Sequence, residues 1–188
     1  MASDWRSSIV AIGFVLAVAF PAPVGAKAFF SKGEALALAF PDADRIDTRS
    51  VLLDGVQTQA IEQASRAKLE SRIVTLHTGW KDGVVQGYAF IDVQVVRTLP
   101  EACLIVLTPD GAVRSLRVIA FYEPADYLPT DRWLGQFAGR ALSPDLALNR
   151  GIDGIAGATL SAGAITSGVR RALAFYAHVI VPQKIAGH

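Results

Sequence analysis

Cysteine and histidine are scarce in this 188-residue sequence, which contains one cysteine and three histidines. A lone cysteine cannot form an internal disulfide, a cysteine-ligated zinc site or a structural iron–sulfur centre. Cys103 lies in the apolar run 102–107, where we expect it to be a small buried hydrophobe. His77, His178 and His188 show neither metal-ligand spacing nor a Ser-His-Asp or Cys-His arrangement. The sequence therefore predicts no metal centre and no hydrolase, and the stability of the domain must come from its core.

An excess of charge is also lacking, because 18 Lys and Arg residues are balanced by 17 Asp and Glu residues. Proteins that bind DNA or RNA usually gather basic residues on one surface. We therefore expect no nucleic-acid partner. Hydrophobic residues make up 52% of the chain, which is enough for the core of one ordinary domain at this length.

The pattern of residues 1–26 is typical of a secretory signal peptide. Arg6 precedes an unbroken apolar run over residues 9–20, and a proline-containing segment with small residues leads to Ala26. The run has twelve residues, fewer than the ~20 that a membrane-spanning helix needs. We expect cleavage after Ala26, with a retained membrane anchor as the alternative. The protein is then expected in the periplasm or at the outer face of the cytoplasmic membrane.

The remaining sequence predicts an α+β fold, in which helices pack on an antiparallel sheet. Ser31 and Glu34 have the spacing of a capping box and predict a short helix that Pro41 ends. Residues 45–53 predict a strand and residues 58–69 a helix. Short connections with Asp-Gly or Pro favour hairpins between the later strands. Four β-rich runs are expected, at residues 73–78, 84–96, 102–107 and 112–122.

The most informative stretch is Asp-Gly-Ile-Ala-Gly-Ala-Thr-Leu-Ser at residues 153–161. Gly154 and Gly157 permit a tight turn and close approaches to the backbone. Thr159 stands where a helix is expected to begin, because apolar residues then recur at three- and four-residue intervals. A glycine loop before a helix presents unpaired N–H groups and the positive end of the helix dipole, so it favours a phosphate. Neither Gly-Lys-Ser/Thr nor Gly-x-Gly-x-x-Gly is present, which excludes the common nucleotide loops.

This pattern resembles the attachment motif of the FMN-binding domain family. That family occurs in subunits of the Rnf and sodium-pumping NADH:quinone oxidoreductase complexes, and in free-standing periplasmic flavoproteins. Its motif Asp-x-x-Ser/Thr/Ala-Gly-Ala-Thr-x-Ser/Thr is the target of a flavin transferase, which joins FMN phosphate to the threonine by a phosphoester. The resemblance implies that Thr159 carries covalent FMN, although Ala156 stands where Ser or Thr is usual. The other positions implied in the FMN site are Asp153, Gly157, Ala158, Leu160 and Ser161.

The resemblance extends over roughly residues 70–178, because residues 87–90 and the Pro-Asp-Gly turn at 109–111 are similar to the family's usual sheet. We therefore assign residues 70–188 to a single FMN-binding domain. Residues 27–69 are expected to be an N-terminal extension of that domain, with helical and strand segments.

Weaker candidates lie after the last expected strand. The family often carries a Glu there, near the flavin ring, which would assign Glu123 to FMN binding, although Glu-Pro-Ala-Asp replaces the Glu-Thr-Pro-Gly of its membrane-complex members. Tyr127 and Trp133 are expected in a buried aromatic cluster, with stacking on the isoalloxazine as the alternative. Asp131 is expected to cap a short helix. For His77 we favour a surface or hydrogen-bonded sheet histidine over a flavin or metal contact.

Taken with the signal pattern, the resemblance implies an exported flavoprotein that transfers electrons between membrane or periplasmic partners. A flavin transferase and a redox partner protein would then be required. The alternative is a non-redox periplasmic module, in which the glycine loop binds a phosphate-containing ligand reversibly or only packs. In the latter case Thr159 or Ser161 would be a plain helix cap. A self-contained flavoenzyme is less favoured, because the small chain shows no convincing acid–base pair.

Overall fold

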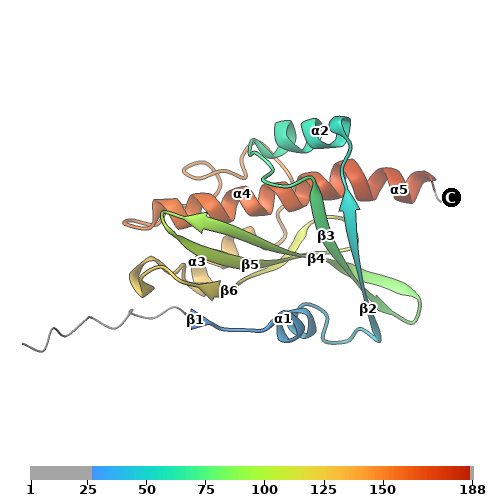
Figure 1. Cartoon of the computed structure of the whole chain (residues 1–188), viewed down its shortest axis with the longest axis horizontal. Helices are drawn as coiled ribbons and strands as arrows, with labels where there is room; N and C mark the ends of the chain where they lie inside the picture. The colour runs from blue at the N-terminus through green and yellow to red at the C-terminus, as the bar shows by residue number, and fades with distance from the viewer. Residues whose placement is uncertain (1–26, 187–188) are drawn as a thin grey trace, which may run out of the picture.

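The computed structural model describes residues 27–186; residues 187–188 and the expected signal peptide, residues 1–26, lie outside the described part of the chain. The described residues form one sheet with helices on both faces (Figure 1). The strand order is β1-β6-β5-β4-β3-β2, and each neighbouring pair is antiparallel. The expected α+β fold with an antiparallel sheet is confirmed.

The elements follow one another with short connections, except for the long segment between the last strand and the main helix. The strands are β1 (Lys27–Ala28), β2 (Arg45–Leu52), β3 (Ile73–Lys81), β4 (Val84–Val96), β5 (Leu99–Leu107) and β6 (Val113–Phe121). The α-helices are α1 (Lys32–Ala39), α2 (Gly55–Ser65), α3 (Asp131–Leu134), α4 (Thr159–Phe175) and α5 (Val181–Ala186). Two 3-10 turns (Ala125–Tyr127 and Gly135–Phe137) flank α3, and a π-helical turn (Tyr176–Ile180) joins α4 to α5. Within residues 27–186, no helix is both long and apolar enough to cross a membrane.

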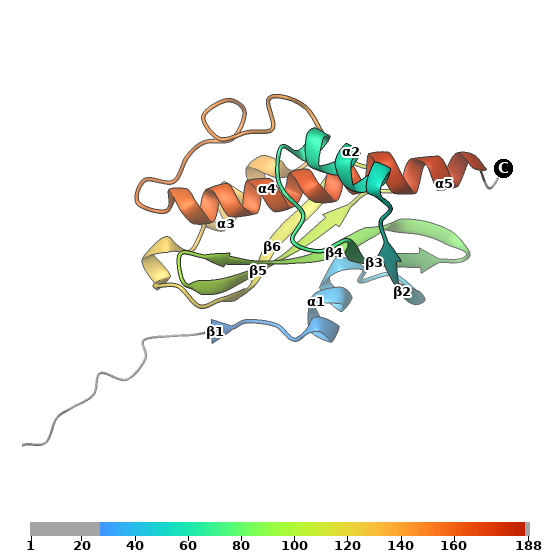
Figure 2. The same ribbon diagram turned by 45° about the horizontal axis from the view of Figure 1, so that its top comes forward.

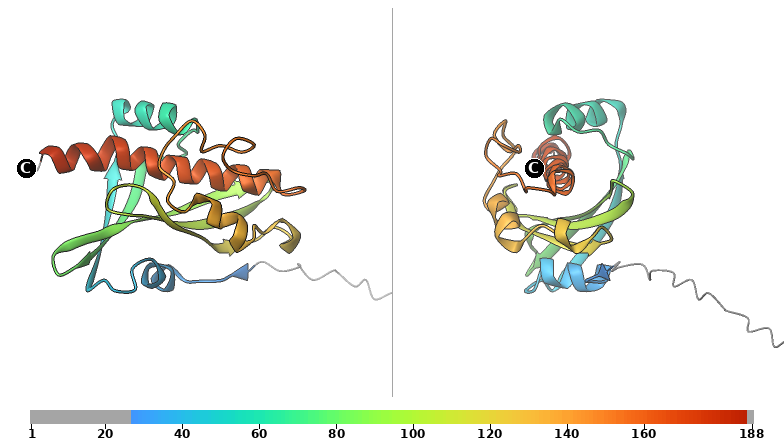
Figure 3. Two further views of the ribbon diagram at one scale, coloured as in Figure 1. Left: turned by 180° about the vertical axis from the view of Figure 1, so that it is seen from behind. Right: turned by 90° about the vertical axis from the view of Figure 1, so that its left-hand side faces the viewer.

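Each face of the sheet has its own hydrophobic core. The main core lies between the sheet and α4, and Figure 3 shows the sheet curving around this helix. The smaller core lies on the opposite face, where α1 packs. The main core includes Phe90, Ile105, Ile165, Val169, Leu173 and Cys103, which is buried as expected. The smaller core includes Leu36, Phe40, Ala89, Leu104, Val106 and Ile119.

The N-terminal segment is built into this sheet. Strand β1 pairs with β6 and strand β2 pairs with β3, so the two strands form the opposite edges of the sheet. The capping box predicted for α1 is present, since the Ser31 N–H donates to Glu34 Oε2 at 2.8 Å and the Glu34 N–H donates to Ser31 Oγ at 3.3 Å. Residues 27–69 and the later strands therefore share one sheet.

Several boundaries differ from the sequence predictions, including the end of α2 at Ser65 and of β3 at Lys81. Three differences have a clear cause, which is a capping side chain or a proline accepted in a strand. Asp54 and Gln57 form a second capping box, so α2 begins before the expected range 58–69. Thr130, and not Asp131, caps α3 by accepting the Trp133 N–H at 3.3 Å. Strand β5 begins before residue 102 and contains a proline, which is tolerated close to a strand end because only one donor is lost.

The Arg170 guanidinium holds α4 against the segments behind it. Arg170 is buried and donates to four backbone carbonyl oxygens. The acceptors Ala64 and Ser65, at 2.9 and 2.7 Å, end helix α2. The acceptors Ser143 and Leu146, both at 2.8 Å, lie in the connection that precedes α4. Because carbonyls at a helix C-terminus have no partner within the helix and carry partial negative charge, a cation is well suited to this position.

We predict that Arg170→Met lowers the free energy of unfolding by at least about 3 kcal/mol, because it leaves buried carbonyls without donors. Chemical denaturation of the chain from Lys27 measures the effect. Arg49→Met is the matched control, since Arg49 is exposed and makes one hydrogen bond, to Gln183. The control is expected to change stability by no more than about 0.5 kcal/mol. Equal effects of the two substitutions would contradict the structural role of Arg170.

Candidate functional site

Thr159 lies at the point where the glycine-rich stretch becomes helix α4. It is exposed and is the first residue of this 17-residue helix. Gly157 has φ 81°, a conformation that favours glycine, and a Cβ at this position would have nothing within 4 Å. The N-cap residue is Ala158, and no side chain caps the helix. The first N–H groups of α4 therefore have neither an intrahelical acceptor nor a side-chain cap.

The capping alternative for Thr159 and Ser161 is wrong. Thr159 follows the N-cap residue, and Ser161 is 2% exposed and lies on the face of α4 that packs on the sheet. The contrast with other helices is clear, because Ser31 caps α1, Asp54 caps α2 and Thr130 caps α3. The longest helix of the described chain is thus the one that begins with an exposed threonine and no capping side chain.

The loop before α4 is fixed by its backbone. Figure 2 shows this connection as a looped segment beside α4. The Trp133 indole N–H donates to the Asp153 carbonyl at 2.7 Å, and the Asp153 N–H donates to Gln136 Oε1 at 2.9 Å. Ile152, the residue before Asp153, is fully buried in the main core. Asp153 itself is exposed. The backbone of the motif is therefore anchored, while its first residue faces solvent.

The three weaker candidates have structural partners. Trp133 is 7% exposed and packs edge-on against Phe137, which agrees with the expected aromatic cluster. Tyr127 is half-buried, and the Arg97 guanidinium lies 4.9 Å from its ring centroid. Glu123 is buried, and its Oε1 atom accepts backbone N–H groups of the β4–β5 hairpin, from Thr98 at 3.3 Å and Leu99 at 3.2 Å. Each of these contacts gives the residue a role in packing or in holding the backbone.

His77 is a hydrogen-bonded sheet histidine, as favoured from the sequence. It is buried, and its Nδ1 atom lies 2.7 Å from the Thr48 hydroxyl on the neighbouring strand. Burial, with a smaller effect of Lys32, lowers the pKa of His77. The ring is therefore stabilised in its neutral form.

A buried carboxyl lies beneath the first turn of α4. Glu101 of β5 is 3% exposed, and its Oε2 atom is buried without a hydrogen-bond partner. The Cys103 thiol lies 3.9 Å from Oε1. Burial raises the pKa of Glu101 to about 7, and this effect outweighs the interaction with the Ser161 hydroxyl, which lowers it. Since the Ser161 hydroxyl belongs to the turn that begins at Thr159, Glu101 lies close to the motif in space.

Sequence reasoning missed Glu101. The expected strand began at residue 102, after the proline, so Glu101 was left in a connection. Had the strand been extended by two residues, the alternation of strand side chains would have placed Glu101 on the same face as Cys103 and Ile105. An acidic residue on an otherwise apolar face is an informative signal, because buried carboxyls are rare without partners.

A second polar contact joins α4 to β4. Arg171 Nη2 donates to both carboxylate oxygens of Asp92, at 3.0 Å each, and the two side chains are largely buried. Gln94 donates to Asp92 Oδ2 and also to the Ala164 carbonyl, at 2.7 Å. Gly168 lies directly against this contact, because an added Cβ would collide with Asp92 Oδ2. The ion pair therefore requires a glycine in the middle of α4.

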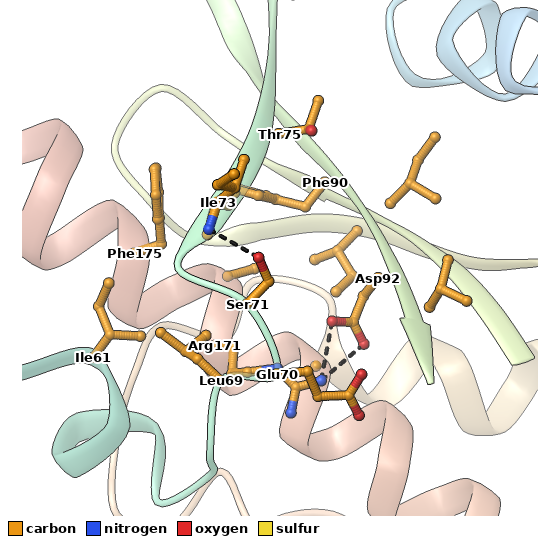
Figure 4. Close-up of a pocket in the computed structure, with 16 residues that line it drawn as sticks. Ile61, Leu69, Glu70, Ser71, Ile73, Thr75, Phe90, Asp92, Arg171 and Phe175 are labelled. Carbon is orange, nitrogen blue, oxygen red and sulfur yellow. Dashed lines mark hydrogen bonds and ion pairs between the residues drawn. The ribbon is translucent and has the colours of Figure 1, made fainter. Parts of the chain in front are cut away.

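The same ion pair borders a cavity of about 260 Å³ (Figure 4). The cavity lies where the sheet divides, since the β3–β4 pairing extends only to His77 opposite Ala89, while β3 continues to pair with β2. Apolar walls include Ile61, Phe90, Ile105 and Phe175, and polar groups include Glu70, Ser71, Asp92 and Arg171. Gly168 is nine residues beyond Thr159, or roughly 13 Å along the helix axis. The cavity is therefore separate from the glycine loop, and no residue of the predicted FMN site lines it.

No protein-family model matches the chain, and no curated protein matches it significantly in sequence.

We predict opposite effects of alanine at two glycines of α4. Gly168→Ala is expected to destabilise the protein by about 1–3 kcal/mol, because Asp92 is held by two partners and cannot move aside freely. Gly163→Ala is expected to stabilise it by about 0.5–1 kcal/mol, because the nearest atom to its added Cβ is Leu148 Cδ1 at 4.0 Å. Thermal and chemical denaturation measure both variants. The same sign of change in both would contradict the close approach of α4 to β4.

We also predict that ionisation of Glu101 destabilises the folded protein. Its pKa rises from 4.5 to about 7 on folding, so the folded state binds the proton more tightly than the unfolded state. This contribution to stability is complete below about pH 4.5 and is lost as pH rises through 7, by on the order of 3 kcal/mol. Denaturation at pH 5.5 and 8.5 should show a larger loss of stability for the native chain than for Glu101→Gln. Parallel pH dependence of the two proteins would refute the assignment.

Proposed function

We propose that this protein is an exported flavoprotein that carries FMN through a phosphoester at Thr159 and transfers electrons between membrane or periplasmic redox partners. The observation that carries the proposal is the position of Thr159, an exposed hydroxyl-bearing residue at the start of a long helix without a side-chain cap. The motif that resembles the flavin transferase target surrounds this residue.

The residues at this position fit an attached phosphate. The uncapped amides and the positive end of the α4 dipole stabilise negative charge at the Thr159 side chain. Gly157 has no atom within 4 Å of where a Cβ would stand, so the turn before Thr159 is open on that side. Ala158 is small and buried, which places the backbone of the turn close to the core. These features favour an anion bonded to Thr159 over a hydroxyl used only for local structure.

One exposed apolar side chain adjoins the attachment position. Leu160 is 53% exposed on the outer side of the first turn, and an exposed leucine there is available to contact a flat apolar ring. When bound, FMN supplies one- and two-electron redox chemistry, while the protein supplies the tether and the surroundings of the ring. Outside the cytoplasm a covalent tether is useful, because FMN that dissociates there is not readily replaced. The chain then functions as an electron-transfer domain and depends on a flavin transferase for its maturation.

The first test is to export the chain from Lys27 to a bacterial periplasm together with a flavin transferase. We expect the added mass of one FMN on the peptide that contains Thr159, and flavin absorbance that remains with the protein after denaturation. Thr159→Ala is expected to abolish both. A known target domain processed in the same cells shows that the transferase is active.

Thr130→Ala is a matched control, because Thr130 also stands at the start of a helix. It is expected to keep the flavin and to lose about 1 kcal/mol of stability, since Thr130 is a true side-chain cap. Thr159→Ala should show the reverse, with loss of flavin and little change in the stability of the unmodified protein. An unmodified Thr159 beside a processed control domain would overturn the proposal, and reversible binding of inorganic phosphate would then favour the non-redox module.

A further inference from the structure

The Glu101 carboxyl is buried and one of its oxygen atoms has no hydrogen-bond partner among the described residues. It is 97% removed from solvent, its Oε2 atom has no hydrogen-bond partner, and its polar neighbours are the Ser161 hydroxyl and the Cys103 thiol, which lies 3.9 Å from Oε1. A buried carboxylate normally receives several donors or a cation, because its desolvation is costly. The surroundings of Glu101 therefore favour a side chain that gains and loses a proton.

The charged side chains around Glu101 already have other partners. On β4, Asp92 is paired with Arg171 of α4, so this cation is used elsewhere. After β6, Glu123 binds two backbone N–H groups. Asp92, Glu123 and Cys103 bring further acidic groups toward Glu101, and the Ser161 hydroxyl faces it from α4. Negative charge added near the first turn of α4 is thus expected to promote protonation of Glu101.

We propose that Glu101 is a redox-linked proton site, which binds a proton when the flavin attached at Thr159 is reduced. The inference rests on the proposed function, because it needs the flavin near the start of α4. The link from attachment residue to carboxyl is short, since Thr159 and Ser161 share one helical turn and Ser161 contacts Glu101.

Reduction of the attached flavin would change the charge near Glu101 by one unit. Two electrons from a reductant and one proton from water enter the flavin, which leaves it with one added negative charge. Glu101 takes a second proton from water at its carboxylate and becomes neutral. At an effective dielectric constant of about 20, a unit charge ~10 Å away changes the pKa of a carboxyl by about one unit. Between the pKa values of Glu101 in the two redox states, reduction therefore binds one additional proton.

The test uses the flavinylated chain with ¹³C-labelled glutamate. The carboxyl resonance of Glu101 is titrated by NMR in the oxidised protein and in the dithionite-reduced protein, and Glu101→Gln assigns the signal. We expect the reduced protein to titrate about one pH unit higher. The midpoint potential of the native protein should fall more steeply with pH between the two pKa values, and Glu101→Gln should lose this steeper range.

Glu62→Gln is the matched control, because Glu62 is a largely buried carboxyl on α2 whose Oε1 atom accepts the Leu69 N–H at 3.0 Å, a bond that glutamine can still accept. It is expected to keep the steeper range. Identical titration of Glu101 in both redox states, or identical pH dependence of the potential in native protein and Glu101→Gln, would overturn the inference while leaving the flavin attachment intact. A chain that receives no flavin overturns the proposed function and this inference together.

Discussion

Helix α4 is positioned by one buried cation, and the candidate site depends on that position. Arg170 binds the last carbonyls of α2 and two carbonyls of the connection before α4, so a single guanidinium fixes three segments. The next residue, Arg171, reaches the sheet through Asp92. Adjacent arginines on a helix point about 100° apart, so the pair holds α4 on two sides. The direction in which Thr159 faces solvent at the start of the helix follows from this double attachment.

The face of the sheet beneath α4 is apolar under the middle of the helix and carries a buried carboxyl under its start. Toward the middle of the helix, residues such as Ile165 and Val169 pack on Phe90 and Ile105 in an ordinary apolar core. Toward its start, Glu101 replaces such a contact and lacks a partner for one oxygen. A carboxyl of this kind reduces stability near neutral pH, and proteins retain such costs chiefly at functional sites. This carboxyl lies beneath the turn of α4 that contains Thr159 and Ser161.

Local sequence signals were sufficient for much of the fold. The range of β4 was predicted from a run of β-forming residues, and the capping box at Ser31 from a four-residue pattern. The errors have local physical causes. The helix expected at residues 58–69 begins earlier because Asp54 and Gln57 form a capping box, and Asp131 was expected to cap α3 in place of its neighbour Thr130. The proline in β5 was treated as a strand end, although near the end of a strand it removes only one hydrogen-bond donor.

The two parts of the candidate site differ in how far sequence could reveal them. The Thr159 motif is contiguous, because a glycine turn and a helix start are formed by neighbouring residues. Glu101 and Ser161 meet only because β5 lies beneath α4, and that contact depends on the register of the paired strands and on the position of α4. No short pattern encodes such a contact. Under the proposed function the two parts would differ in role, since the contiguous part would govern attachment of FMN and the non-local part the electrostatic surroundings of its ring. If the proposed function holds, substitutions on β5 would change the potential of the flavin while the attachment motif stays intact.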